Sequence, residues 1–124
     1  AGGGERILLV EDEEGVRELA REVLFAAGYE VECAASLAEA RAAVDAAPGF
    51  DLLFTDMALP DGDGLGLAIE IQAQEPRIRV LLTSGYVDHL HRWPLIREHG
   101  YRLLRKPYPI AALQAAVREV LDAG

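Results

Sequence analysis

The sequence predicts an α/β protein built on a parallel β-sheet. Five short apolar runs with the character of strands alternate with segments in which apolar residues recur at helical spacing. The run at 50–55 is apolar on both faces, as expected for a central parallel strand that helices cover on both sides. A chain of 124 residues that is 51% hydrophobic is long enough for one domain with a well-developed core. These observations together predict a (βα)5 order.

The first half of the chain contains two strands and two helices before the central strand. A strand at 7–10 leads into a helix that Gly28 ends, and the next strand lies near 29–34. The apolar residues whose helical spacing predicts this first helix are Val16, Leu19, Ala20, Val23, Leu24 and Ala27. Ser36, with Glu39 three residues later, has the form of a capping box that opens a second helix to about residue 46.

The second half repeats this alternation after the strand at 50–55. Its predicted elements are a helix near 63–74, a strand at 78–83, a less regular helix near 87–98, a strand at 102–105 and a helix near 110–122. Strands this short, joined by helices with right-handed crossovers, favour a flavodoxin-like doubly wound parallel sheet with the strand order 2-1-3-4-5.

Composition excludes several classes of function. A net charge of −9 disfavours direct binding to nucleic acid and to anionic membranes, because both depend on Lys and Arg. No apolar run approaches the roughly 18 residues that a membrane span needs, and the start resembles no signal peptide, so we expect a cytoplasmic protein. The single cysteine, Cys33, excludes an internal disulfide and is expected to pack as a buried side chain.

Acidic residues gather at the ends of two predicted strands. Glu11 and Asp12 follow the strand at 7–10, and Asp56 follows the strand at 50–55. The C-terminal ends of parallel strands open onto one edge of a sheet, so these carboxylates are expected to share a crevice. Like charges there cost energy unless a cation lies between them, and oxygen ligands suit Mg²⁺. The alternative is attraction to a helix N-terminus, which suffices for Glu13 and Glu14 and explains Glu11 and Asp12 less well.

Lys106 follows the strand at 102–105 and would bring an ammonium group to the same edge of the sheet. A lysine at a strand end is more often a surface residue, and the Asp and Gly residues at 61–64 are ordinary turn and helix-start residues. Turn chemistry, however, does not require an acid at position 56. The set of charged residues therefore predicts a pocket for Mg²⁺ and a phosphoryl group, although each residue alone is a weak signal.

Taken as a set, these residues resemble the receiver domain of two-component response regulators over nearly the whole chain. The resemblance rests on Val10-Glu11-Asp12-Glu13, on Asp56-Met57 with Pro60 and Gly64, on Thr83-Ser84-Gly85-Tyr86, and on Lys106-Pro107-Tyr108. Asp56 precedes Ser84 by 28 residues and Ser84 precedes Lys106 by 22, as the family's fourth and fifth strands require. The receiver domain is expected to occupy 5–124, with 1–4 as a linker or cloning remnant.

The resemblance implies a metal site in the acidic crevice. Asp12 would be a direct Mg²⁺ ligand, together with the carboxylate of Asp56, and Glu11 would act through water. The carbonyl oxygen of Ala58 would complete the protein's share of the coordination. Mn²⁺ is expected to substitute for Mg²⁺.

The resemblance also makes Asp56 the phosphoacceptor. Attack by one anion on another requires positioning and charge neutralisation more than it requires a proton acceptor. Lys106 would supply positive charge and the Ser84 hydroxyl a hydrogen bond to a phosphoryl oxygen, with backbone N–H groups near Met57 and Gly85 as further donors. Such a domain catalyses its own phosphorylation and slow dephosphorylation, and has no separate turnover substrate.

The partner implied is a histidine kinase or a histidine phosphotransfer protein, in a two-component system or phosphorelay. Thr-Ser-Gly-Tyr after the fourth strand and Lys-Pro-Tyr after the fifth look like receivers of hybrid histidine kinases. A kinase-fused or free-standing receiver is therefore favoured over a transcription factor fragment, and a monomer or weak dimer is expected.

Three details of the resemblance concern the fifth strand and the fourth helix. Receivers of this kind usually have a cis peptide at the position of Lys106-Pro107. Leu103 stands where the family commonly has a Tyr or Phe switch residue, so we expect apolar repacking rather than a hydrogen-bonded switch. Pro94 should remove a hydrogen bond from the fourth helix and leave it short, kinked or loose, which makes 84–99 the expected moving segment.

Two other functions share parts of this pattern. An aspartate-nucleophile phosphohydrolase would resemble its family in a second Asp two residues after the nucleophile, where this chain has Ala58. A receiver-like binding module that is never phosphorylated would have lost the acid pair, the Asp or the Lys, and none is lost here. His89 and His91 are interpreted as surface residues, and Trp93 as a partly buried anchor or a contact for a partner.

Overall fold

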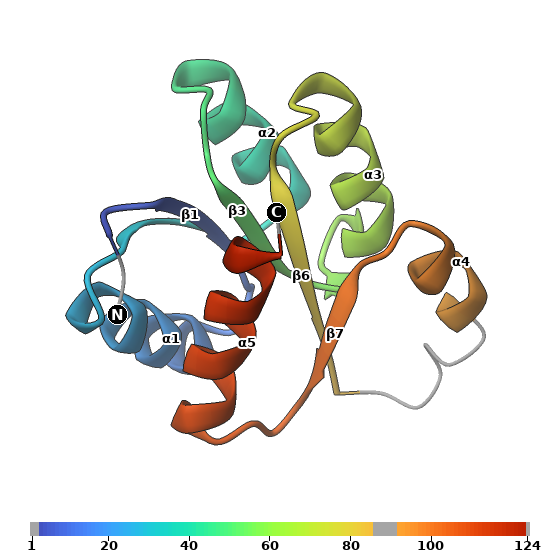
Figure 1. The fold of residues 1–124 in the computed structure, drawn as a ribbon. Coiled ribbons are helices and arrows are strands. Elements are labelled where there is room, and N and C mark those ends of the chain that lie inside the picture. The colour runs from blue at the N-terminus through green and yellow to red at the C-terminus, as the bar shows by residue number, and fades with distance from the viewer. Residues whose placement is uncertain (1–2, 86–91, 124) are drawn as a thin grey trace.

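Five parallel strands form the central sheet in the computed structural model, which describes residues 3–85 and 92–123 (Figure 1). The strands lie in the order β2-β1-β3-β6-β7. This order confirms the predicted 2-1-3-4-5 sheet, because the labels β4 and β5 belong to a separate short hairpin. The strands are β1 (Arg6–Val10), β2 (Glu30–Ala34), β3 (Leu52–Asp56), β6 (Arg79–Ser84) and β7 (Arg102–Arg105). The helices are α1 (Glu14–Ala26), α2 (Leu37–Ala46), α3 (Gly64–Gln74), α4 (Trp93–Glu98) and α5 (Ile110–Asp122).

Helices cover both faces of the sheet and divide the core into two apolar clusters. Helices α1 and α5 pack on one face and contribute Ala20, Leu24, Leu113, Ala116 and Val117 to the first cluster. Helices α2, α3 and α4 pack on the other face, with Val44, Leu67, Ile71 and Ile96 among their buried residues. Every residue of β3 is buried as a result, as predicted for a central parallel strand. No helix in the described ranges is long and apolar enough to cross a membrane.

The alternation of side chains along the strands decides which strand-end residues meet. Leu9 in β1, Phe54 in β3, Leu81 in β6 and Leu104 in β7 all belong to the cluster under α1 and α5. Two residues further along each strand, the same face carries Glu11, Asp56, Thr83 and Lys106. We call this side of the sheet the α1–α5 face. The sheet thus collects two acids, a hydroxyl and an ammonium at one edge of one face.

Apart from the start of α4, the element boundaries lie within two residues of the predicted ones, and several match them. Helix α1 begins at Glu14, so that its first turn includes an acidic side chain, and Gly28 follows with a positive φ of 100°. Strand β3 begins at Leu52 rather than at residue 50. The helical spacing of apolar residues correctly predicted α1, in which Ala20 and Leu24 are buried and Leu19 is 54% exposed.

A two-stranded hairpin, β4 (Ala58–Leu59) and β5 (Gly62–Asp63), follows β3 and was not predicted. The carboxylate of Asp61 at its turn accepts hydrogen bonds from the N–H groups of Leu37 (2.8 Å) and Ala38 (3.1 Å) at the start of α2. The Ser36 hydroxyl accepts the third bond, from the N–H of Glu39, which confirms the predicted cap. Backbone hydrogen bonds from Leu37 and Ala38 hold the pKa of Asp61 below its usual value. The hairpin is thereby tied to a helix 24 residues earlier.

Helix α4 spans only six residues, as the prediction of a short helix required, but the reason is different. Pro94 lies in the first turn, where its missing N–H removes no intrahelical hydrogen bond. It therefore fits the start of the helix and does not break its interior, and the prediction of a lost hydrogen bond was wrong. The predicted start of this helix near 87, with His89 and His91, lies outside the described residues. Trp93 is 41% exposed at the first position of α4.

Cys33 in β2 is half-buried and packs against the cluster under α1 and α5. Burial raises the pKa of its thiol, so the neutral form is favoured. This agrees with the predicted packing role.

Candidate functional site

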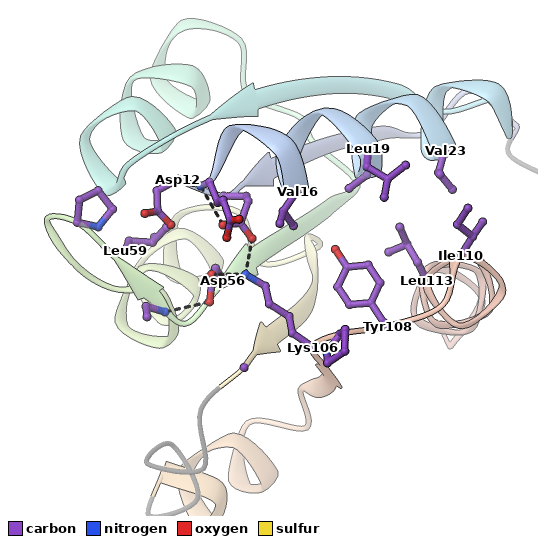
Figure 2. Close-up of a pocket in the computed structure, with 17 residues that line it drawn as sticks. Asp12, Val16, Leu19, Val23, Asp56, Leu59, Lys106, Tyr108, Ile110 and Leu113 are labelled. Carbon is purple, nitrogen blue, oxygen red and sulfur yellow. Dashed lines mark hydrogen bonds and ion pairs between the residues drawn. The ribbon is translucent and has the colours of Figure 1, made fainter.

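The ends of β1, β3 and β7 bring the charged residues of the sequence motifs together. The N–H of Glu11 donates to the carbonyl of Ala34 (3.0 Å) and continues the pairing of β1 with β2. Asp56 is the last residue of β3, and the N–H of Lys106 donates to the carbonyl of Ser84 (2.9 Å) at the end of β6. The backbone of each charged residue is thus held by the sheet, and their side chains converge in Figure 2.

Lys106 bridges two buried carboxylates. Its Nζ lies 2.6 Å from Oε1 of Glu11 and 2.7 Å from Oδ2 of Asp56. The side chains of Glu11 and Asp56 are only 4% and 8% exposed, and that of Lys106 is 20% exposed. Charges this far from water are tolerated only when they are paired, and removing one partner of a buried pair costs about 3–5 kcal/mol. The lysine therefore holds two carboxylates that would otherwise repel each other.

The electrostatics of the pocket shift two pKa values. Burial raises the pKa of the Glu11 carboxyl, and the hydrogen bond from Lys106 opposes this effect only in part. Burial alone would lower the pKa of the Lys106 ammonium, but its hydrogen bonds to Asp56 and Glu11 outweigh burial and raise it. The lysine consequently remains charged throughout the neutral range.

The same residues could hold a divalent cation. Glu11, Asp12 and Asp56 each offer a carboxylate oxygen, and these oxygens lie within 4.8 Å of one another. One ammonium faces three carboxylates, so a further cation would reduce their repulsion. The donors are all hard oxygens, which fit Mg²⁺ or Mn²⁺ rather than a thiophilic metal. Both oxygens of Glu11 accept hydrogen bonds, from Lys106 and from the N–H of Glu13 (3.1 Å).

Two backbone N–H groups follow Asp56 in the region predicted to supply donors. The N–H of Met57 donates to the carbonyl of Thr83 (2.9 Å), so the sheet uses it. The N–H of the next residue, Ala58, donates to Oδ1 of Asp56 at 3.1 Å. Ala58 also lines the pocket.

Ser84 is the one predicted site residue that does not line the pocket. It is 4% exposed and ends β6. The alternation of β6 places it on the face opposite Thr83. The next residue, Gly85, does line the pocket. The peptide bond between Lys106 and Pro107 is cis, which confirms the predicted cis peptide. The structure therefore gathers Glu11, Asp12, Asp56, Ala58 and Lys106, and leaves Ser84 beside them.

The pocket continues from the acidic residues into an apolar groove between α1 and α5. The whole cavity has a volume of about 840 Å³. Figure 2 shows Val16, Leu19 and Val23 of α1 across from Ile110 and Leu113 of α5, with Tyr108 on the side of Lys106. We call these six residues the apolar groove. Leu19 and Ile110 are 54% and 51% exposed, although both are large and apolar. Sequence reasoning missed this groove because helical spacing alone does not distinguish a core stripe from the wall of an open cavity.

Comparison with known proteins identifies a family model and several relatives that match this chain. The family model "Response regulator receiver domain" matches residues 7–118. The sensor kinase CckA of Brucella abortus (strain 2308) is 32% identical over 121 residues, which are 97% of this chain and 13% of that protein. The response regulator protein PilR of Pseudomonas aeruginosa is 32% identical over 117 residues, or 94% of this chain and 26% of that protein. The chain thus spans only a small part of either relative.

Other similar proteins are matched over their whole length. The response regulator receiver protein CpdR of Brucella abortus (strain 2308) is 28% identical over 118 residues, which cover 95% of this chain and 98% of that protein. A solved CheY-like receiver domain protein of Methanospirillum hungatei JF-1 superposes with a TM-score of 0.89 at 28% identity and covers 98% of this chain and 96% of its own.

Gly64 is expected to be essential to the geometry around Asp56. A Cβ atom at this position would lie 1.9 Å from the carbonyl oxygen of Asp56, a contact that only backbone movement could relieve. Gly64→Ala should lower the free energy of unfolding by about 3 kcal/mol or more, measured by urea denaturation. Gly15→Ala is the matched control, because no atom lies within 4 Å of its Cβ position and α1 should gain up to roughly 1 kcal/mol. Equal stability of Gly64→Ala and the wild type would contradict this account.

Proposed function

Because this chain belongs to the response regulator receiver domain family, whose members act in two-component signalling, we propose that Asp56 is the residue on which it accepts a phosphoryl group. One observation carries the assignment. Asp56 ends the central strand inside the pocket, and the ammonium of Lys106 lies 2.7 Å from its carboxylate. A buried carboxylate beside a fixed cation, open to a cavity, is suited to attack a phosphoryl group.

The transfer requires one bond to form and one to break. An oxygen of the Asp56 carboxylate forms a bond to the phosphorus of a phosphohistidine, and the phosphorus–nitrogen bond breaks. The electron pair of that bond remains on the imidazole nitrogen. The departing imidazole is neutral when its other ring nitrogen carries a proton. Lys106 neutralises negative charge close to the reacting oxygens, and the N–H of Ala58 orients the carboxylate through Oδ1. Ser84 is proposed to donate to a phosphoryl oxygen after the end of β6 shifts.

Receiver domains bind Mg²⁺ at an acidic pocket, and we assign that role here to Asp12 and Asp56 directly, with Glu11 through water and the carbonyl of Ala58 as a further ligand. The pocket holds the three carboxylates of Glu11, Asp12 and Asp56 and the one ammonium of Lys106, and this excess of negative charge supports the assignment. When bound, the metal ion supplies positive charge to the phosphoryl oxygens. Mn²⁺ has the same preference for oxygen ligands and is expected to replace it.

The domain is not a classical enzyme, and we propose that its only catalysis is the phosphorylation and dephosphorylation of Asp56 itself. A phosphohydrolase of the aspartate-nucleophile class would need a general acid two residues after Asp56, where Ala58 offers only a methyl group. A binding module without phosphorylation is disfavoured because the acid pair, Asp56 and Lys106 are all present and in contact or close proximity.

Receiver domains interact with histidine kinases or histidine phosphotransfer proteins, and we propose that such a partner docks over the apolar groove. The groove opens beside Asp56 and carries two large exposed apolar side chains, Leu19 and Ile110. A partner that covered them would bring its phosphohistidine to the acidic end of the same cavity.

The net charge of −9 supports the absence of direct nucleic acid or membrane contacts, and we expect a monomer or weak dimer in the cytoplasm.

We propose that phosphorylation is transmitted through the segment 84–99, of which 84, 85 and 92–99 are described. Ile96 anchors α4 in the cluster under α2–α4, and Leu103 packs against the same cluster from β7. Arg92, just before α4, pairs with Asp63 of the hairpin at 2.6 Å. An apolar route through Ile96 and Leu103 is therefore continuous between the end of β6 and the surface of α4.

The assignment of Asp56 is tested by intact-mass measurement after incubation with acetyl phosphate and Mg²⁺. We expect one added phosphoryl group in the wild type, none in Asp56→Asn, and none when a chelator removes the metal. Lys106→Met should reduce the phosphorylation rate by roughly 100-fold, because it removes a charge-assisted contact worth about 1.5–3 kcal/mol. Undiminished modification of Asp56→Asn would refute the assignment.

The docking proposal is tested by comparing two kinds of phosphodonor. With a phosphorylated histidine phosphotransfer protein that modifies the wild type, Leu19→Gln should slow transfer by about tenfold, because the side chain buries apolar area in the complex. With acetyl phosphate its rate should equal that of the wild type. Phe25→Gln is the matched control, since Phe25 is also exposed on α1 (68%) but lies outside the groove. Equal effects of the two substitutions on the protein donor would exclude docking at the groove.

The output route is tested by backbone amide shifts with and without beryllofluoride, a mimic of the phosphoryl group. We expect shifts in 84–99, including α4, in addition to those beside Asp56. Leu103→Tyr should alter the pattern in α4 because it changes the apolar contact with the cluster around Ile96. Shifts limited to the neighbours of Asp56 would indicate that the domain relays phosphate without a conformational signal.

A further inference from the structure

The hydroxyl of Thr83 is buried without a hydrogen-bond partner among the described residues. Thr83 is 2% exposed in β6, so water does not replace the missing partner at the surface. The other buried threonine beside the site, Thr55, is fully enclosed as well, but its hydroxyl donates to the carbonyl of Asp56 at 3.0 Å. An unpaired buried hydroxyl destabilises a fold, so its presence at Thr83 calls for a physical explanation.

Thr83 lies directly beside Asp56. The two residues are register partners across β3 and β6, and both side chains lie on the α1–α5 face. Neighbouring strands are about 4.8 Å apart, so a rotation of the Thr83 side chain about χ1 brings its hydroxyl toward the carboxyl group of Asp56. On its other side Thr83 is paired with Leu104, which offers no polar side-chain atom. The Asp56 carboxyl group is therefore the side-chain acceptor that the strand register places next to Thr83 on that face.

The donors that Asp56 uses here cannot all be retained after phosphorylation. Oδ1 accepts from the N–H of Ala58 and Oδ2 from the ammonium of Lys106. A phosphoryl group places its negative charge on three outer oxygens, and the flexible lysine follows that charge. The carboxyl oxygen that Lys106 leaves stays buried and loses its donor. The Thr83 hydroxyl is a donor on the neighbouring strand and has no hydrogen-bond partner among residues 3–85 and 92–123.

We propose that Thr83 is a positioning residue of the phosphorylated state, in which its hydroxyl donates a hydrogen bond to the carboxyl group of Asp56. The inference rests on the proposed phosphorylation of Asp56. It assigns Thr83 a role separate from that of Ser84, which follows it on the opposite face of the strand. The hydroxyl is unpaired in the unphosphorylated fold and paired in the phosphorylated one, so it shifts the balance between the two states.

Thr83→Val separates this role from simple packing because valine has nearly the same shape. In the metal-free protein, removal of the unpaired hydroxyl should raise the urea denaturation midpoint. In the presence of Mg²⁺, the affinity for beryllofluoride, measured by titration, should fall by up to about tenfold, because one buried hydrogen bond to the carboxyl oxygen is lost. Substitution of a purely structural residue would not raise the denaturation midpoint and at the same time lower the affinity for beryllofluoride.

Two variants serve as controls. Thr83→Ser keeps the hydroxyl and should bind beryllofluoride within about twofold of the wild type, although loss of the methyl group lowers the denaturation midpoint. Thr55→Val removes a hydroxyl that is already hydrogen-bonded. The urea denaturation midpoint of this variant should therefore fall, whereas that of Thr83→Val should rise.

Three results would overturn the inference. Wild-type beryllofluoride affinity in Thr83→Val would show that the hydroxyl does not contact the Asp56 side chain in the phosphorylated state. A lower denaturation midpoint in Thr83→Val would show that the hydroxyl is already bonded before phosphorylation. Failure of the wild type itself to bind beryllofluoride and to gain a phosphoryl group would overturn the proposed function together with this inference, whereas the first two results leave that function intact.

Discussion

The ammonium of Lys106 between the carboxylates of Glu11 and Asp56 is the interaction on which the site depends. Two acids that are almost fully buried sit on adjacent strands, and without a cation their repulsion and desolvation would oppose closure of the sheet. The lysine comes from β7, which is separated from β3 by β6. Its side chain must therefore pass over the end of β6, beside Gly85. A Cβ atom at Gly85 would lie 3.6 Å from Cβ and 3.8 Å from Cδ of Lys106, which places the lysine stem in van der Waals contact with this position.

The packing of the sheet between two helix layers explains why the acids converge on one face. Two apolar clusters occupy the two faces, and the strands alternate between them without a break. A shift of one residue in any strand would move its terminal side chain to the opposite face and out of the pocket. The loop after β3 is equally constrained, because Gly64 approaches the carbonyl of Asp56 more closely than any side chain allows. The core and the site therefore share the same geometric requirements.

The pocket combines a charged end with an apolar end. Under the proposed function, the acidic end and Lys106 would receive the phosphoryl group and a metal ion, and the groove between α1 and α5 would receive an apolar surface of the partner. The chain corresponds to 13% of the sensor kinase CckA and to 98% of CpdR, so similar domains occur in proteins of very different length.

The sequence by itself determined the strand order, the burial of β3 and the convergence of Glu11, Asp12, Asp56 and Lys106, because period, spacing and the geometry of parallel sheets are local or topological properties. It also indicated the Ser36 cap and, through resemblance to receivers, the cis bond before Pro107. Only the tertiary structure decided that Leu19 lines a groove, that Asp61 caps α2, that the N–H of Ala58 donates to Asp56, and that the Thr83 hydroxyl has no partner among the described residues. These features depend on which distant atoms meet, and the pattern of residues along one chain carries no such information.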